Sequence, residues 1–205
     1  MNHKKIIILF LFSIPIQLIA QKDYAITIEN DTIYGKIISS FGEKKIKTKN
    51  GKILISVENY KAYYKKKGKK HFEAIVYPLQ YNTGELFFEQ RLVSGEISLY
   101  ESVHSESVTF DPNNTQFAHS KTSTYLYVLK GYLPSILSTN GMFQSNKRHK
   151  KVLSLISDNS KLAEKFKTMS GSIKNIKYIL TEYNKEFNPD NKKYYSPTIR
   201  KYKIE

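Results

Sequence analysis

Alternating apolar and polar residues predict a series of antiparallel β-hairpins in the first two thirds of the chain. In the segment 85–103, a Ser94-Gly95 break separates two alternating runs and predicts a two-residue turn with Leu92 opposite Ile97. In this register Glu89 and Glu101 lie on opposite faces of the hairpin, so they cannot form a paired-carboxylate site. The apolar face of the hairpin would hold Leu86, Phe88, Leu92, Ile97, Leu99 and Val103.

Two earlier hairpins follow the same rule. An Asn30-Asp31 turn would place Ile28 opposite Ile33, and an Asn50-Gly51 turn is the strongest turn signal in the chain because both residues tolerate positive φ. The first hairpin would turn Lys36 away from its apolar face, which holds Tyr24, Ile26, Ile28, Ile33, Gly35 and Ile37. The second would bury Ile46, Ile53, Ile55 and Val57, and would place Lys45, Lys47, Lys49 and Lys52 beside Leu54 on the other face. Those lysines must be solvated or meet an anion.

Further strand signals complete a meander of about eight to ten strands, which is typical of a sandwich or an open barrel. Tyr60–Tyr64 and Phe72–Tyr77 flank the loop KKKGKK, with Gly68 at its tip. An edge strand is expected at Ser107–Phe110 before the turn DPNN, and another strand at Tyr125–Leu129.

From about residue 145 the apolar spacing becomes helical. Three apolar stripes predict three helices: Val152, Leu155 and Ile156; Leu162, Ala163, Phe166 and Met169; and Ile173, Ile176, Leu180, Tyr183 and Phe187. Gly171 and Ser172 suit the C′ position of the second helix and the N-cap of the third. We expect the third helix to cover Phe87 and Tyr100 on the second face of the 85–103 hairpin.

The chain is therefore expected to have a β-dominated α+β fold, with an antiparallel meander followed by about three helices packed on it. Residues 1–20 resemble a signal peptide, because Lys4 and Lys5 precede an apolar run that ends at Ala20. The predicted divisions are a signal peptide at 1–20, an antiparallel β region at 21–137, a helical segment at 138–189 and a basic, tyrosine-containing tail at 190–205. Export would make the protein periplasmic, outer-membrane associated or secreted.

Composition adds two constraints to this prediction. The chain contains no cysteine, so no disulfide can form and an exported protein of this length must gain its stability from burial. The net charge is +15, or +13 without Lys4 and Lys5, which predicts attraction to anionic partners but does not identify them.

The order of the motifs resembles that of a group of uncharacterised exported β-rich proteins common in Bacteroidetes-type bacteria. The resemblance rests on NDTIYGKI, LVSGEISLYE, YLYVLKG, KKVLSLISDNSKLAEKF and KYILTEYNKEF, and it covers most of the chain after residue 20. It implies a shared architecture and no catalytic residues, because no activity is assigned to that group.

No catalytic, metal-binding or cofactor-binding motif is recognisable. The histidines lack the spacing of metal ligands, and GKK at 68–70 lacks the rest of a phosphate-binding loop. No serine lies in a nucleophile motif. His104 lies near Glu101 and Glu106 in the sequence and could poise a proton transfer, although a solvated loop histidine is the simpler interpretation.

Two basic clusters are candidates for anion binding, and tyrosines occur near the first. Their residues are Lys65, Lys66, Lys67, Lys69 and Lys70 in the first cluster, and Lys147, Arg148, Lys150 and Lys151 in the second. Cations in the first turns of a helix interact unfavourably with the positive end of the helix dipole, and a bound anion would offset this unfavourable energy. The alternatives are a helix that begins later, near Val152, and a simple solvated surface.

These patterns favour a non-enzymatic, exported cell-envelope protein that binds or has a structural role, with a basic surface for anionic lipid or polysaccharide. The alternative is a hydrolase or lyase with an unrecognised site of carboxylates and His104. Nucleic acid is an unlikely partner because export would separate the protein from it. Neither the ligand nor the oligomeric state follows from the sequence.

Overall fold

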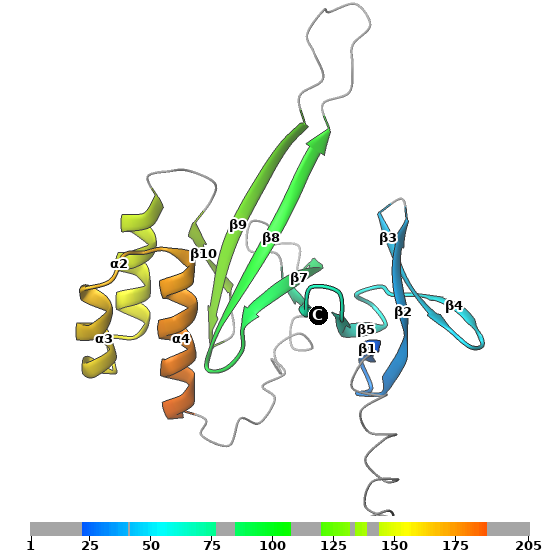
Figure 1. The fold of residues 1–205 in the computed structure, drawn as a ribbon, viewed down its shortest axis with the longest axis horizontal. Helices are drawn as coiled ribbons and strands as arrows, with labels where there is room; N and C mark the ends of the chain where they lie inside the picture. The colour runs from blue at the N-terminus through cyan, green and yellow to red at the C-terminus, as the bar shows by residue number, and fades with distance from the viewer. Residues whose placement is uncertain are drawn as a thin grey trace, which may run out of the picture. The chain divides into compact units, whose positions relative to one another are not determined.

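The structure is a computed structural model that describes residues 22–40, 42–76, 85–107, 120–131, 134–138 and 144–187. The expected signal peptide, the DPNN turn and the tail at 190–205 lie outside these residues. The chain divides between Ala74 and Ile75 into two compact units, called here the N-terminal unit and the C-terminal unit. The fold is β-dominated and antiparallel, with three helices after the strands, as predicted (Figure 1).

The N-terminal unit is an antiparallel sheet in which each strand is hydrogen-bonded to its neighbours in the order β6-β5-β1-β2-β3-β4. β4 forms one edge of this order, so these strands do not close into a barrel. Strand β6 continues across the boundary between the units. The strands are β1 (Asp23–Thr27), β2 (Thr32–Ser40), β3 (Glu43–Thr48), β4 (Gly51–Leu54), β5 (Tyr60–Lys65) and β6 (Lys70–Val76).

The register of β1 against β2 differs from the prediction. Ala25, not Ile28, lies opposite Ile33, because the last pair is Ile26 with Thr32, so that five residues rather than two separate the paired positions. Thr27 closes this connection: its N–H donates to the Asp31 carbonyl at 2.9 Å, and its Oγ1 accepts from the Asp31 N–H at 3.1 Å. Ala25 and its neighbour Ile26 are both buried, so alternation of apolar and polar residues does not select the register of β1.

In the β3–β4 hairpin the predicted faces are confirmed although the turn lies one residue earlier. Thr48 is opposite Gly51, so Lys49 and Asn50 form the turn. Moving the turn by one residue shifts the pairing by two, and a shift of two leaves every side chain on its original face. Ile46 is fully buried, whereas its partner Ile53 is 40% exposed on the edge strand. The β5–β6 hairpin around Gly68 is also confirmed.

The C-terminal unit contains a second antiparallel set of strands in the order β10-β9-β8-β7. Strands β8 and β9 are each eleven residues long and pair along their whole length, and β9 includes the predicted strand Tyr125–Leu129. The described part of β8 reaches Ser107, and the rest of the predicted edge strand lies outside the described residues. The strands are β7 (Leu86–Val93), β8 (Ile97–Ser107), β9 (Ser120–Lys130) and β10 (Pro134–Ser138).

The hairpin of β7 and β8 contains an irregularity that the sequence did not reveal. The pairing shifts between Arg91 and Val93, so that Val93 rather than Leu92 shares the apolar face with Leu99. The expected pairing of Leu92 with Ile97 is therefore wrong. The separation of the two glutamates is confirmed, because Glu101 lies opposite Gln90 whereas the buried Glu89 accepts a hydrogen bond from Ser102 at 2.8 Å.

Asn184 explains the geometry of this turn. Its Oδ1 accepts from the Ile97 N–H at 2.9 Å, and its Nδ2 donates to the carbonyls of Ser94 at 3.2 Å and Ile97 at 2.9 Å. Gly95 has a φ of 148°, and a Cβ on it would lie 2.3 Å from Asn184 Cγ. The turn is thus shaped around a buried side chain that lies 87 positions beyond Ile97 in the chain.

Three helices pack on this sheet, as expected: α2 (Ser145–Leu155), α3 (Ser160–Lys167) and α4 (Ile173–Phe187). Ser172 caps α4 by accepting the Asn175 N–H, which confirms the predicted N-cap. Gly171 does not adopt the positive φ of a C′ glycine. It is instead required by close packing, because a Cβ there would lie 2.1 Å from the Ser145 carbonyl oxygen.

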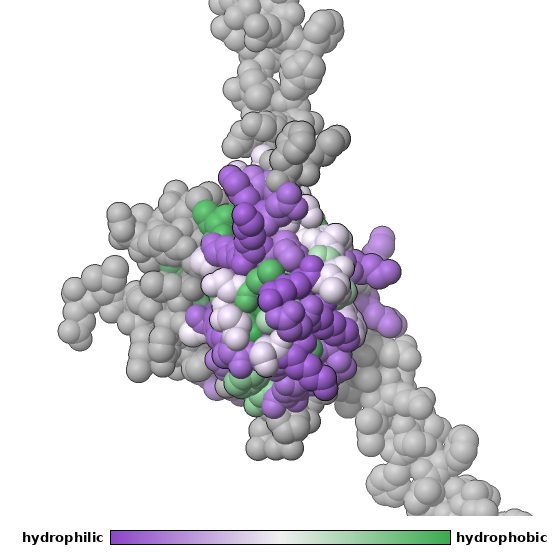
Figure 2. All heavy atoms as spheres, turned by 90° about the vertical axis from the view of Figure 1, so that its left-hand side faces the viewer, coloured by the Kyte–Doolittle hydropathy of each residue, from purple (hydrophilic) through white to green (hydrophobic). Residues whose placement is uncertain are grey.

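The helices pack on the face of β8 that carries Ile97 and Leu99, and not on the predicted face that carries Tyr100. Ile97 and Leu99 belong to the main core together with Ile176 and Leu180 of α4. Tyr100 points to the opposite face, where it packs with Tyr127, Leu129 and Ile75, so the expectation that α4 covers Tyr100 is wrong. Figure 2 looks onto the helical side of this unit, where hydrophilic side chains predominate and only small apolar areas are visible between them.

A polar cluster joins α4 to the end of β9. Tyr183 donates to Asp158 at 2.7 Å, and the Lys130 ammonium donates to Asp158 and to the Tyr183 hydroxyl, both at 3.0 Å. The Tyr183 hydrogen bond, followed by the contribution of Lys130, lowers the pKa of Asp158 despite the opposing effect of partial burial. Asp158 is therefore held ionised between a strand and a helix.

We expect Asn184→Ala to lower the free energy of unfolding by about 2–4 kcal/mol, because it leaves buried groups of the turn without their partner. Gly95→Ala should lower it by about 2 kcal/mol through the clash with Asn184. The double variant should lose less than the sum, because Asn184→Ala vacates the space that the new methyl group needs. Urea denaturation monitored by circular dichroism gives the free energy of unfolding of all three variants. Strictly additive losses would contradict this account of the turn.

We expect Asp158→Asn to destabilise the protein near pH 7 by less than about 1 kcal/mol, since the Asp158 side chain is 48% exposed. The folded state lowers the pKa of Asp158, so its carboxylate contributes stability above the unfolded pKa and loses that contribution as the pH falls through the folded pKa. The stability difference between the wild type and the variant should therefore shrink in acid. A stability difference that persists below the folded pKa of Asp158 would contradict this role of its carboxylate.

Candidate anion-binding cleft

Between residues 22 and 187, the excess positive charge is concentrated in the N-terminal unit. Residues 22–74 contain thirteen lysines, no arginine and six acidic residues, for a net charge of +7. Residues 75–187 are twice as long, yet their thirteen basic and ten acidic residues give only +3. An electrostatic site for an anion is therefore best sought in the N-terminal sheet.

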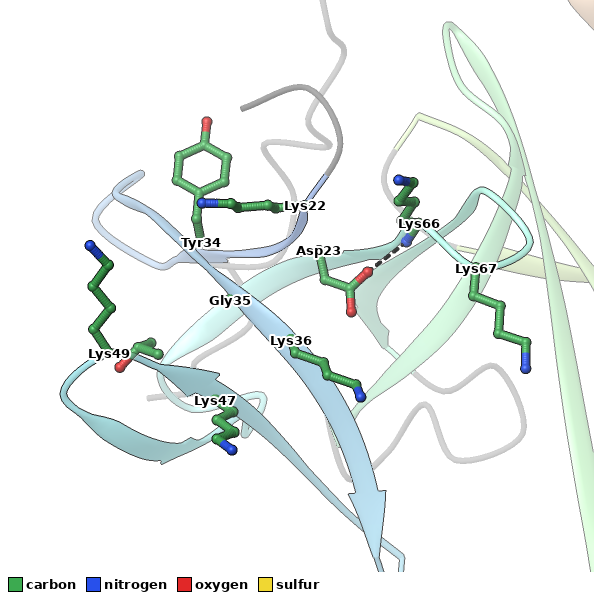
Figure 3. A pocket seen from close by; sticks show the side chains of 10 residues that line it. Lys22, Asp23, Tyr34, Gly35, Lys36, Lys47, Lys49, Lys66 and Lys67 are labelled. Atoms are coloured by element: carbon green, nitrogen blue, oxygen red, sulfur yellow. Dashed lines mark hydrogen bonds between the residues drawn. The ribbon is translucent and has the colours of Figure 1, made fainter. Parts of the chain in front are cut away.

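A cavity of about 610 Å³ opens on this sheet (Figure 3). Its volume lies in the range of about 300–1,000 Å³ that is typical of ligand sites. We call it the lysine cleft, because the residues that line it include Lys22, Lys36, Lys47, Lys49, Lys66 and Lys67. These lysines are spread along the unit's sequence from residue 22 to residue 67, and the strand pairing brings them to one cavity.

Strand register places three lysines in a row across β2, β3 and β4. Lys36 lies opposite Lys47, and Lys47 lies opposite Lys52. None of the three forms an ion pair within the described part of the chain, whereas Lys45 pairs with Glu43 at 2.7 Å. Like charges directly opposite one another destabilise a sheet by a few tenths of a kcal/mol or more. A bound anion would convert this repulsion into attraction.

Asp23 is the one acidic residue among the described residues that line the cleft, and both of its carboxylate oxygens already accept hydrogen bonds from backbone amides. One carboxylate oxygen accepts from the Ile37 N–H at 2.8 Å, and the other accepts from the Lys66 N–H at 2.8 Å. The second bond is drawn as a dashed line in Figure 3. Asp23 thus fixes the turn that carries Lys66 and Lys67 beside β2.

Gly35 allows the close approach of β2 and β3 in the wall of the cleft. A Cβ at this position would lie 2.5 Å from the Lys47 carbonyl oxygen and 2.7 Å from Ile46 Cγ1. Backbone atoms cannot move away without opening the sheet, so a side chain here would displace Lys47 from its neighbours.

The structure brings part of the first predicted basic cluster into the cleft. Lys66 and Lys67 line it, whereas the ammonium of Lys65 donates to Ser39 Oγ at 3.1 Å. Lys69 and Lys70 are exposed in and beside the same turn. The candidate role of these residues in anion binding stays a prediction.

The second basic cluster lies in the first two turns of α2, so the helix does not begin as late as Val152. Arg148 Nε donates to the Gly171 carbonyl at 3.1 Å, and the Lys151 ammonium donates to the Ile136 carbonyl. Lys147 and Lys150 are exposed. Two of the four cations thus have structural contacts within the unit, and the role of this cluster in anion binding also stays a prediction.

Sequence reasoning missed Lys22 and assigned Lys36 only to a polar face. The alternation that placed Lys47 and Lys49 on one face was informative, because both line the cleft. What could not be foreseen was the pairing of β1 with β5, which is separated from it by three other strands in the sequence.

The alternative catalytic site gains no support from the geometry. His104 lies within β8, opposite Ser123, rather than in a loop. Among the described residues, no three histidine or acidic side chains gather in a way that could hold a metal ion. A hydrolase or lyase site around His104 stays a prediction.

Comparison with known proteins gives no further guidance. No protein-family model, curated protein sequence or solved structure matches the chain. The resemblance to exported proteins of Bacteroidetes-type bacteria therefore stays a prediction. Within the described residues, no helix combines the length and apolar character needed to span a membrane.

We expect Asp23→Ala to lower the free energy of unfolding by about 2–3 kcal/mol, because two backbone amides lose a charged acceptor. Asp23→Asn should lose about half as much, since its single carbonyl oxygen can still accept one of the two bonds. Urea denaturation gives the stabilities, and NMR amide exchange at Ile37 and Lys66 locates the loss. Unchanged protection of both amides in Asp23→Ala would contradict the role of this carboxylate.

Proposed function

We propose that the protein is a non-enzymatic, exported cell-envelope protein whose N-terminal unit binds an anionic envelope component in the lysine cleft. The observation that carries the proposal is the convergence of six lysines on one cavity whose only described acidic residue, Asp23, is engaged by backbone amides. A cavity of this kind favours a ligand with several negative charges. Anionic lipid and acidic polysaccharide are two envelope components that carry such charge.

The electrostatics of the cleft support binding rather than a structural role for these lysines. A structural lysine forms an ion pair or donates to a carbonyl, as Lys130 does in the C-terminal unit. Lys36 and Lys47 instead face each other across the strands of an open cleft. Their mutual repulsion is tolerated by the fold and disappears when an anion binds between them.

Binding should weaken strongly as salt rises, because exposed charges are screened beyond about 8–10 Å at physiological ionic strength. The probes are a soluble polyuronate and vesicles that contain phosphatidylglycerol, with neutral dextran and phosphatidylcholine vesicles as uncharged references. We expect at least one of the charged probes to bind and the neutral ones not to bind. Binding that is independent of salt would contradict an electrostatic site.

Replacement of Lys36, Lys47 and Lys49 by glutamine should weaken binding of the charged probe by about tenfold or more, because each exposed ion pair contributes up to about 1 kcal/mol. The matched control replaces the exposed helical lysines Lys161, Lys174 and Lys177 by glutamine, which removes the same net charge outside the cleft. The control should bind within about twofold of the wild type. Equal weakening in both triple variants would show that net charge alone acts, and would overturn the cleft as the site.

A further inference from the structure

An aromatic ladder runs across four neighbouring strands of the N-terminal sheet. Tyr24 is paired with Tyr34 on β2 and with Tyr64 on β5, and Tyr64 is paired with His71 on β6. Consecutive ring centroids along this ladder lie 6.1, 5.2 and 4.5 Å apart. Directly paired residues share one face of a sheet, so all four rings lie on the same face.

This face also carries lysines of the cleft. Tyr34 and Lys36 are two residues apart in β2, so their side chains point to the same side, about 6.5 Å apart along the strand. Lys47 shares that side because it lies opposite Lys36. The aromatic ladder therefore ends at the lysine row, and Tyr34 is the residue where the two meet.

Tyr34 is also the most accessible ring of the ladder. Its side chain lines the cleft and is 46% exposed, whereas the other three rings are partly buried. Figure 3 shows the ring projecting from β2, with Lys22 next to it in this view and Lys36 further along the strand. A ligand in the cleft would therefore meet an aromatic ring and several ammonium groups together.

We infer that the ligand of the lysine cleft is an acidic polysaccharide, with a sugar ring stacked on Tyr34 and its carboxylates held by Lys36 and Lys47. This inference rests on the proposed anion-binding function and names its ligand. A sugar ring has an apolar face that packs on an aromatic ring, while its acidic substituents lie at the ring edge. A lysine-lined cleft with an exposed tyrosine matches both parts of such a ligand.

The shape of the site favours this ligand over a membrane surface. A flat bilayer contacts the most protruding charges of a protein and would not contact an aromatic ring inside a cavity. The lysine cleft is concave, and its lining comes from β1, β2, β3 and the β5–β6 turn. A narrow chain of sugars can enter such a cavity and contact several of its walls at once.

The decisive variant is Tyr34→Ala, tested on the full mature protein with a uronic acid oligosaccharide by isothermal titration calorimetry. We expect affinity to fall about tenfold, in line with the loss of one stacked ring. Tyr34→Phe keeps the ring and should bind within about twofold of the wild type. Tyr178→Ala is the matched control, because Tyr178 is exposed on α4 and does not line the cleft. Thermal unfolding of each variant verifies that it is folded.

The same measurements separate the failure of this inference from the failure of the proposed function. Weaker binding in both Tyr34→Ala and the Lys36, Lys47 and Lys49 triple variant supports the acidic polysaccharide. Unchanged affinity in Tyr34→Ala, with loss in the triple variant, overturns the stacked sugar and keeps anion binding. Unchanged affinity in both overturns the two proposals together.

Three further probes test the competing ligands. Lysine-dependent binding to phosphatidylglycerol vesicles, without binding of the oligosaccharide, would overturn the inference in favour of lipid. Tighter binding of single-stranded DNA than of the oligosaccharide would overturn it in favour of nucleic acid, since bases also stack on tyrosine. A neutral oligosaccharide should not bind detectably, and equal binding of the neutral and acidic sugars would overturn the role of charge.

Discussion

The carboxylate of Asp23 is the interaction on which the lysine cleft depends. It accepts one hydrogen bond from β2 and one from the turn after β5, so a single side chain on β1 joins three parts of the N-terminal sheet. Those parts supply Lys36, Lys66 and Lys67. Without an acceptor at this point, two backbone amides would need other partners and the lysines would repel one another without a nearby negative charge. Asp23 therefore supports the fold and the site through the same two bonds.

A comparable role in the C-terminal unit belongs to Asn184. This buried side chain of α4 satisfies three backbone groups of the β7–β8 turn, and α4 also packs its apolar residues against β8. Its amide specifies which helix position meets the turn, since buried polar groups require particular partners whereas apolar packing tolerates several arrangements. The two units thus use the same device: a polar side chain, fixed by backbone groups, sets how elements distant in sequence are placed.

Local patterns predicted the class of fold because alternation and helical spacing depend on neighbouring residues. The Asn50-Gly51 signal gave the correct faces of β3 and β4 even though the turn lies one residue earlier. The same patterns failed wherever a distant residue decides the geometry. Asn184 was not recognisable as part of the β7–β8 turn, because a polar residue near the end of an amphipathic helix has the pattern of an exposed position. The cleft was only partly predictable for the same reason, since Lys66 and Lys47 reach the same cavity through strand pairings that no local pattern specifies.

The misplaced register of β1 and β2 has the largest consequence for the proposed function. With Ile28 opposite Ile33, the even-numbered residues of β1 would share a face with the odd-numbered residues of β2, and Tyr24 would lie on the side away from Tyr34 and Lys36. Five residues, an odd number, separate the last pair of Ile26 and Thr32, so the parity changes and Tyr24 lies directly opposite Tyr34. The aromatic ladder and the lysine row then occupy one face of the sheet. The combination of stacking and charge on which the inferred sugar site rests is thus a product of the connection at 27–31, in which Thr27 and Asp31 are hydrogen-bonded to each other.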